Sequence, residues 1–192
     1  MTAKFATLLA LAGAVALSAS CGDFVRQGRS PVMLVVDSLE DKDGNHTLRS
    51  DVLTSTGTFN DLATASLRIL LKDQGSLGVS ATPSELNQVI IDRYRVEYVR
   101  ADGHNVPGVD VPFSFDSALT QLVTADGDEA IFQIVRHSAK EEAPLAALRL
   151  TGTGHFISTI ATVTFYGHDL AGNDISASGH IGIDFADFAD EN

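Results

Sequence analysis

ISTIATVTFY (residues 157–166) and ISASGHIGIDF (residues 175–185) are the two stretches that decide the fold of this chain. The first is rich in β-branched and aromatic residues. The second alternates between an apolar or small set and a more polar set. Both properties are typical of half-buried β-strands. Because Ala171-Gly172-Asn173-Asp174 supplies a turn between them, the sequence predicts an antiparallel hairpin.

The register of this hairpin follows from the face that each side chain occupies. Cross-strand partners lie on the same face of a sheet. Ala161, Val163 and Phe165 join the apolar set of the last strand only if the numbers of paired residues sum to an even value. We therefore expect a loop with an odd number of residues, three or five. A two-residue turn would pair Phe165 with His180 and turn the apolar face toward water.

The rest of the chain predicts more strands and little helix. Residues 89–100 form the longest further candidate, with Tyr94, Val96 and Tyr98 on one face. Residues 89–91 are apolar on both faces, which fits a bulge near Asp92 or burial on both sides. Residues 109–115 contain Pro112, shortly after Pro107, and fit an edge strand or an extended loop. Pro144 limits the one helical window, at 139–149, to short turns. The other expected strands are residues 32–36, a weaker stretch in 48–59, and residues 65–71, 119–124 and 130–136.

This pattern predicts an all-β fold, an immunoglobulin-like antiparallel β-sandwich of about 7–9 strands. The stretch FYGHDLAGND (residues 165–174) resembles the last two strands of bacterial immunoglobulin-like modules, where an aromatic strand ends in an Asp-x-Ala-Gly-Asn turn. The resemblance covers about 30 residues. The chain has no Trp, so the Cys–Trp–Cys core of antibody domains is absent.

The N-terminus predicts export. Residues 1–20 have the form of a signal peptide, with Lys4 before an apolar core at 5–17 and small residues at 18–20. The stretch LSASCG (residues 17–22) resembles the lipobox of bacterial lipoproteins, which implies lipidation of Cys21 and cleavage before it. Ser18 departs from that pattern, which usually has an aliphatic residue at this place. The alternative is a chance cysteine beside an ordinary cleavage site.

These features divide the chain into a signal peptide at 1–20, a lipidated tether at 21–30 and a single β-sandwich domain at 31–192. Cys21 is the only cysteine, so an internal disulfide is excluded. The chain as a whole resembles exported bacterial lipoproteins of unassigned function. That resemblance implies a cell-envelope location, and Gly22 after the cysteine favours the outer membrane over the inner one.

Charge excludes one class of partner. Without residues 1–20, 12 basic residues remain against 25 acidic ones, a formal charge of −13. Phosphate backbones repel such a chain, so nucleic-acid binding is not expected. Membrane contact is expected through the N-terminal lipid.

Candidate metal sites are weak. Asp41, Asp43 and Asn45 match the first three ligand places of an EF-hand loop, but His46 and Val52 occupy the places that need Gly and Glu. A looser site pooling Asp126, Asp128 and Glu129 with another loop has no further support. His155, His168 and His180 crowd the last hairpin. The register sets His168 opposite about Ser176, too far from His180 for one zinc ion. We expect no metal and no cofactor.

Catalytic signatures are absent from the sequence: it has no Gly-x-Ser-x-Gly elbow, no His-Glu-x-x-His helix and no Gly-rich phosphate loop. We expect no catalytic residues. Tyr94 and Tyr98, with Phe113 and Phe115, have strand spacing and fit a core better than a ligand surface. Arg93, Arg95 and Glu97 are expected to form an exposed ladder with cross-strand acids.

The leading hypothesis is a non-catalytic, lipid-anchored envelope module that binds or scaffolds a protein partner, with docking at residues 109–115. One alternative is a module that binds a glycan, a small ligand or calcium through its loops. A second alternative is an enzyme whose residues converge only in the fold.

Overall fold

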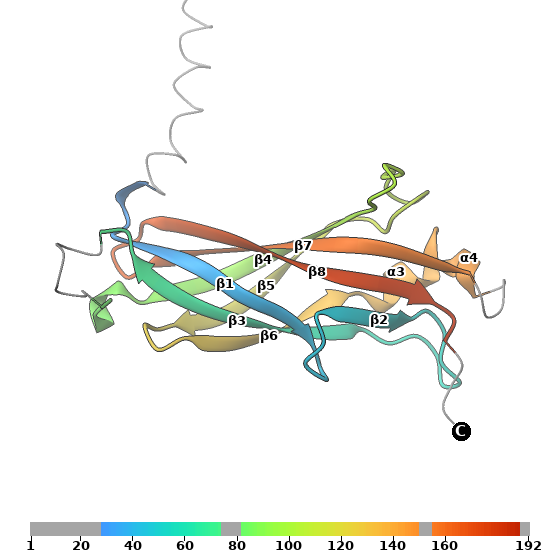
Figure 1. Ribbon diagram of the computed structural model, residues 1–192, viewed down its shortest axis with the longest axis horizontal. Helices are drawn as coiled ribbons and strands as arrows, with labels where there is room; N and C mark the ends of the chain where they lie inside the picture. Colours follow the sequence, from blue (N-terminus) through green and yellow to red (C-terminus); the bar gives the residue numbers. More distant parts are fainter. Residues whose placement is uncertain (1–27, 74–81, 150–154, 189–192) are drawn as a thin grey trace, which may run out of the picture.

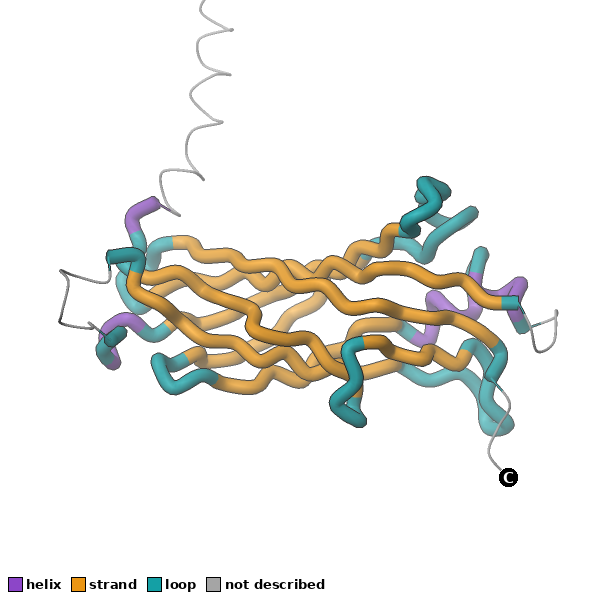
Figure 2. The backbone as a smooth tube through the Cα atoms, in the orientation of Figure 1, coloured by secondary structure: helices purple, strands orange, loops and turns teal. Residues whose placement is uncertain are grey.

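Two packed β-sheets make up the computed structural model, which describes residues 28–73, 82–149 and 155–188 (Figure 1). The first sheet has the order β1-β3-β6, and the second has the order β2-β8-β7-β4-β5. Figure 2 shows the strands running along the length of an elongated body, with loops at both ends. The strands are β1 (Val32–Asp41), β2 (Thr47–Asp51), β3 (Asp61–Leu71), β4 (Val89–Val99), β5 (Phe115–Val123), β6 (Asp128–Val135), β7 (Phe156–Asp169) and β8 (Asp174–Ala186).

The predicted all-β sandwich is confirmed, and its strand order is immunoglobulin-like. The pairs β1–β3, β3–β6, β4–β7 and β7–β8 repeat the neighbours of strands A, B and E in one sheet and C, F and G in the other. The expected antiparallel pairing holds for every described pair of strands except β2–β8, which is parallel. After the turn at residues 42–46 the chain leaves the first sheet and continues beside the last strand of the second.

The hairpin register is confirmed. Phe165 pairs with Ala177 and Val163 with Gly179, so partner numbers sum to an even value. The last pair, His168 with Asp174, leaves a loop of residues 169–173. One detail differs from expectation, since His168 lies opposite Asp174 rather than about Ser176. The apolar set of both strands is buried: Ala161, Val163, Phe165, Ile181, Ile183 and Phe185.

A bulge is present in β4, because its pairing with both neighbours shifts between Ile91 and Arg93. Downstream of it Tyr94 and Tyr98 point into the core, as predicted. The Tyr94 hydroxyl donates to the Gln133 carbonyl at 2.9 Å, and the Tyr98 hydroxyl donates to the Ile134 carbonyl at 2.6 Å. These bonds join β4 in one sheet to β6 in the other. Phe132 and Phe165 pack edge-on at 5.3 Å beside Tyr94.

Three segments differ in extent from the expectation. Residues 109–114 form part of a long loop at 100–114, and β5 begins only at Phe115. Of the weak stretch at 48–59, residues 48–51 belong to β2, while Thr54 to Gly57 close a tight turn. The helical window splits at Pro144 into α3 (His137–Glu141) and α4 (Leu145–Leu148), and a short 3-10 turn η1 (Glu85–Asn87) precedes β4.

The chain enters the sandwich at Ser30, which is buried and whose hydroxyl accepts a hydrogen bond from the Val32 amide at 3.3 Å. The ordered body therefore starts one residue before the expected boundary at residue 31. The expected signal peptide, Cys21 and the tether up to residue 27 lie outside the described residues. In the described part of the chain, no helix is long and apolar enough to cross a membrane.

Candidate functional site

The loop at residues 100–114, called here the distal loop, connects β4 to β5 and projects from the half of the sandwich that carries α3 and α4, away from the start of β1 (Figure 1). Its own side chains hold its shape. Asn105 accepts a bond from the Arg100 amide at 2.6 Å, and Asp110 accepts one from the Val106 amide at 3.0 Å. The Gly108 amide donates to the Val111 carbonyl at 2.8 Å. These bonds hold residues 100–114 in a compact loop rather than in an extended strand.

Gly108 and Phe113 fix the tip of the distal loop. Gly108 has a φ of +76°, and a Cβ at this position would lie 2.5 Å from the Phe113 ring. Only glycine lets the edge of the ring come this close to the backbone here. Phe113 is therefore held in place although its side chain is half exposed. Of the four aromatic residues considered from the sequence, Tyr94, Tyr98 and Phe115 are in the core, and Phe113 is not.

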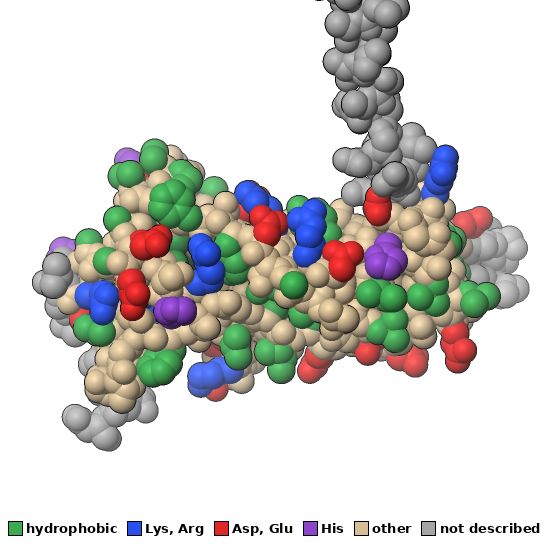
Figure 3. Space-filling model, turned by 180° about the vertical axis from the view of Figure 1, so that it is seen from behind, with side chains coloured by type: hydrophobic (Ala, Val, Ile, Leu, Met, Phe, Trp, Pro, Cys, Tyr) green, Lys and Arg blue, Asp and Glu red, His purple; other side chains and the backbone are tan. Residues whose placement is uncertain are grey.

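The tip presents an apolar surface. Val106 is 56%, Val109 66% and Phe113 49% exposed. Val99 and Ile160 pair across β4 and β7 at the base of the loop, and both are also exposed. Figure 3 shows hydrophobic side chains gathered at this end of the molecule. These five residues form what we call the distal apolar surface.

Charged groups border this surface. Arg100 pairs with Asp102, and that hydrogen bond, helped by the His104 amide, lowers the pKa of Asp102. The border is thus polar and mixed in sign, as at the rim of a protein interface.

The middle of the same sheet face offers little to a partner. Arg93 bonds Asp116 at 3.1 Å, and Arg95 bonds both Asp116 and Glu97. Further along, Thr164 bonds Ser178 at 2.9 Å. The expected ladder of arginines and cross-strand acids is confirmed. The polar groups of this region already bond one another, so a partner that docked here would have to break those bonds.

The candidate calcium residues form a turn. Asp41 accepts bonds from the Asp43 amide and from both the backbone and side chain of Asn45. Burial favours the neutral acid, but these bonds from Asn45 and Asp43 outweigh it and lower the pKa of Asp41. The carboxylate is thus committed to its own turn. Asp128 likewise accepts bonds from the amide and hydroxyl of Thr124.

The histidines do not meet. His168 lies 3.5 Å from Asp92, and His180 bonds Thr162. His180 is six residues along β8 from the partner of His168, a separation of about 20 Å. Over residues 28–73, 82–149 and 155–188, no group of three His, Cys, Asp or Glu side chains could hold a metal ion.

One buried polar cluster escaped the sequence analysis. Lys140 on α3 is 1% exposed and pairs with Asp61 of β3 at 2.9 Å, and the Ser50 hydroxyl of β2 donates to the same carboxylate at 2.6 Å. Burial raises the pKa of Asp61, although Lys140 and Ser50 oppose the shift. Asp61 and Lys140 are 79 positions apart, so no local pattern in the sequence predicts the pair.

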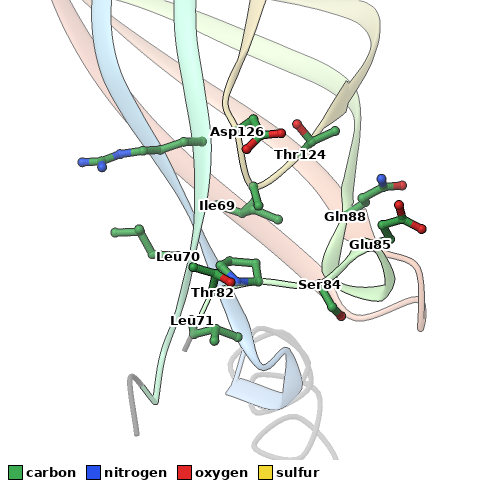
Figure 4. A pocket seen from close by; sticks show the side chains of 12 residues that line it. Ile69, Leu70, Leu71, Thr82, Ser84, Glu85, Gln88, Thr124 and Asp126 are labelled. Carbon is green, nitrogen blue, oxygen red and sulfur yellow. The ribbon is translucent and has the colours of Figure 1, made fainter. Parts of the chain in front are cut away.

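Two hollows lie away from the distal loop. One, of about 690 Å³, lies between the end of β3, η1 and the turn at residues 124–126 (Figure 4). Apolar Ile69 and Leu71 line it together with Glu85 and Asp126. The other, of about 1210 Å³, is a broad groove beside the 41–45 turn and β2.

Comparisons with known proteins add no assignment. No protein-family model matches this chain, and no curated protein matches it.

Proposed function

We propose that this chain is a lipid-anchored, non-catalytic module of the bacterial cell envelope that binds a protein partner through its distal apolar surface. The observation that carries the proposal is the distal loop, which is held rigid by its own hydrogen bonds and still exposes Val106, Val109 and Phe113. Contiguous exposed apolar groups with a polar border are typical of interaction sites.

Rigidity matters because binding normally costs the entropy of ordering loops and side chains. In the distal loop that ordering is already done in the free protein, by Asn105, Asp110 and the contact of Phe113 with Gly108. A partner that covers the tip therefore gains the burial of apolar surface without first fixing the loop.

The lipid anchor rests on the sequence at residues 17–22 and on the single cysteine. The proposal places the anchored chain in the outer membrane rather than the inner one. The test is intact mass and membrane fractionation of wild type and Cys21→Ser. We expect a mass increase from acyl chains and membrane recovery in wild type, both lost in the variant. An unmodified, freely soluble wild type would refute the anchor.

The partner site is tested by crosslinking in envelope extracts, comparing wild type with Val109→Ser/Phe113→Ser. The matched control is Ile131→Ser, since Ile131 is 67% exposed on β6 and outside the distal apolar surface. We expect a specific crosslinked protein with wild type and the control, and its loss with the double variant. Equal capture by all three proteins would remove the distal loop from the site.

A second candidate is ligand binding through the loops. The groove of about 1210 Å³ beside the 41–45 turn favours it, because that groove combines Asp43, Asp51 and Asp184 with Arg49 and Phe188. A panel of calcium, other metals and glycans is the test. A dose-dependent rise in the melting temperature would support this candidate, and no rise across the panel would count against it.

A further inference from the structure

The end of the sandwich opposite the distal loop carries exposed leucines beside the point where the tether enters. Leu86 of η1 is 80%, Leu170 of the β7–β8 turn 49% and Leu122 of β5 42% exposed. We call these three residues the leucine rim. Pairing places them together, because Val89 lies opposite both Asp169 and Val123, and Ile90 lies opposite Leu122.

The tether enters next to this rim. Ser30 is 2% exposed, and its side chain bonds Asp169, the residue directly before Leu170. The point at which the described chain enters the body, at Ser30, is therefore fixed relative to the β7–β8 turn. Nine residues of chain span at most about 30 Å when extended. A lipid on Cys21 would hold this end, and not the distal loop, close to the bilayer.

We propose that the leucine rim rests on a zwitterionic membrane surface, with Leu86, Leu122 and Leu170 at the headgroup boundary, so that the distal loop points away from the bilayer. This inference rests on the lipid anchor of the proposed function. A short tether raises the local concentration of the rim at the bilayer to the millimolar range. At that concentration the leucine rim contacts the bilayer even if the same contact is too weak to hold an untethered protein on a membrane.

The charge of the same end selects the kind of lipid. Glu85 and Asp126 are exposed there, and Arg68, the basic side chain that lines the same hollow, is paired with Asp37 at 2.8 Å. Anionic headgroups would repel these acids, whereas zwitterionic headgroups would not. The length of β4, 11 residues or about 35 Å, then sets the distance at which the distal loop is presented.

The test uses the single cysteine and the absence of Trp from the chain. Residues 21–192 with Leu86→Trp are coupled through Cys21 to a maleimide lipid in phosphatidylcholine vesicles. We expect the tryptophan emission to shift to shorter wavelength on coupling and to be quenched by brominated acyl chains. Val109→Trp, 66% exposed on the distal loop, is the matched control and should show neither change. Vesicles rich in phosphatidylglycerol should reduce the shift.

Two results would overturn the proposal. One is identical emission of Leu86→Trp before and after coupling. The other is a shift without quenching by brominated lipid, which would mean that the rim is covered by a second copy of the chain. Chemical coupling supplies the lipid, so these outcomes are independent of native lipidation. Loss of acylation at Cys21 in cells refutes the anchor, whereas an unshifted Leu86→Trp refutes only the orientation.

Discussion

Lys140 shows at the scale of a single residue how this fold places a charge in its interior. Its ammonium has one carboxylate partner, Asp61, at 2.9 Å, and that carboxylate also accepts the Ser50 hydroxyl. A buried ion pair is costly to break because the remaining partner stays in a medium that solvates it poorly. The pair ties α3 to β2 and β3, three elements that no hydrophobic pattern in the sequence connects.

Lys140→Ala should lower the free energy of unfolding by about 3 kcal/mol at neutral pH, because it leaves the Asp61 carboxylate buried without its cation. Burial already raises the pKa of Asp61 above its usual 3.8. When a carboxyl has a raised pKa in the folded state, the folded protein becomes less stable as pH rises through that pKa. The loss of stability caused by Lys140→Ala should therefore shrink as pH falls toward 4. Urea denaturation at pH 7 and pH 4 measures this.

The double variant Lys140→Ala/Asp61→Ala is the control for that interpretation. Removing both partners leaves no buried charge, so its cost should be well below the sum of the two single costs. Additive costs, or a Lys140→Ala cost equal at both pH values, would contradict a role for the ion pair.

At the scale of elements, the two turns at 41–45 and 169–173 share one construction. Each begins with an Asp whose carboxylate accepts bonds from the amide and side chain of an Asn four residues later. Each has a Gly before that Asn with a φ near +80°. The resemblance of residues 169–173 to a known turn was visible in the sequence. Residues 41–45 form the same turn. Their Asp and Asn residues serve the hydrogen bonds of this turn, so they match only part of a calcium loop.

Asp169→Ala should lower the free energy of unfolding by about 1–3 kcal/mol, since Asp169 is 2% exposed and its loss leaves the Ala171 and Asn173 amides without an acceptor. Burial opposes ionisation of Asp169, but bonds from Asn173 and Ser30 hold its pKa below 3.8. Stability from such a group is lost as pH falls through its folded-state pKa. The difference from wild type should therefore narrow below about pH 4, and a constant difference would contradict this account.

Some features of these elements could be predicted from the sequence and others could not. Alternation and parity were enough for the register of β7 and β8, because one face of each strand is buried and a slip of one residue would expose it. The bulge near Asp92 was one of two explanations that the sequence offered for the apolar residues on both faces at 89–91. The distal loop was not, because its shape depends on Asn105, Asp110 and the contact of Gly108 with Phe113. The parallel β2–β8 pair joins segments more than 130 residues apart, with no local signal.

The whole molecule has two unlike ends joined by strands of up to 14 residues. The leucine rim and the buried Ser30 lie at one end, and the distal apolar surface lies at the other. The proposed anchor at Cys21 would place the leucine rim beside the lipid and the distal loop away from it, free to contact a protein partner.

The same molecule carries a formal charge of −13 over residues 21–192, and this sets its response to salt. Repulsion among its acids destabilises the compact state, and added salt screens it as the Debye length falls from about 30 Å at 10 mM to about 10 Å at 100 mM. The melting temperature should therefore rise by about 2–4 °C over that range, as for a gain near 1 kcal/mol. Exchanging three exposed acids for amides, Glu85→Gln, Asp126→Asn and Glu129→Gln, should reduce the rise, because fewer like charges remain to be screened. If salt left the melting temperature of both proteins unchanged, the net charge would not be what limits their stability.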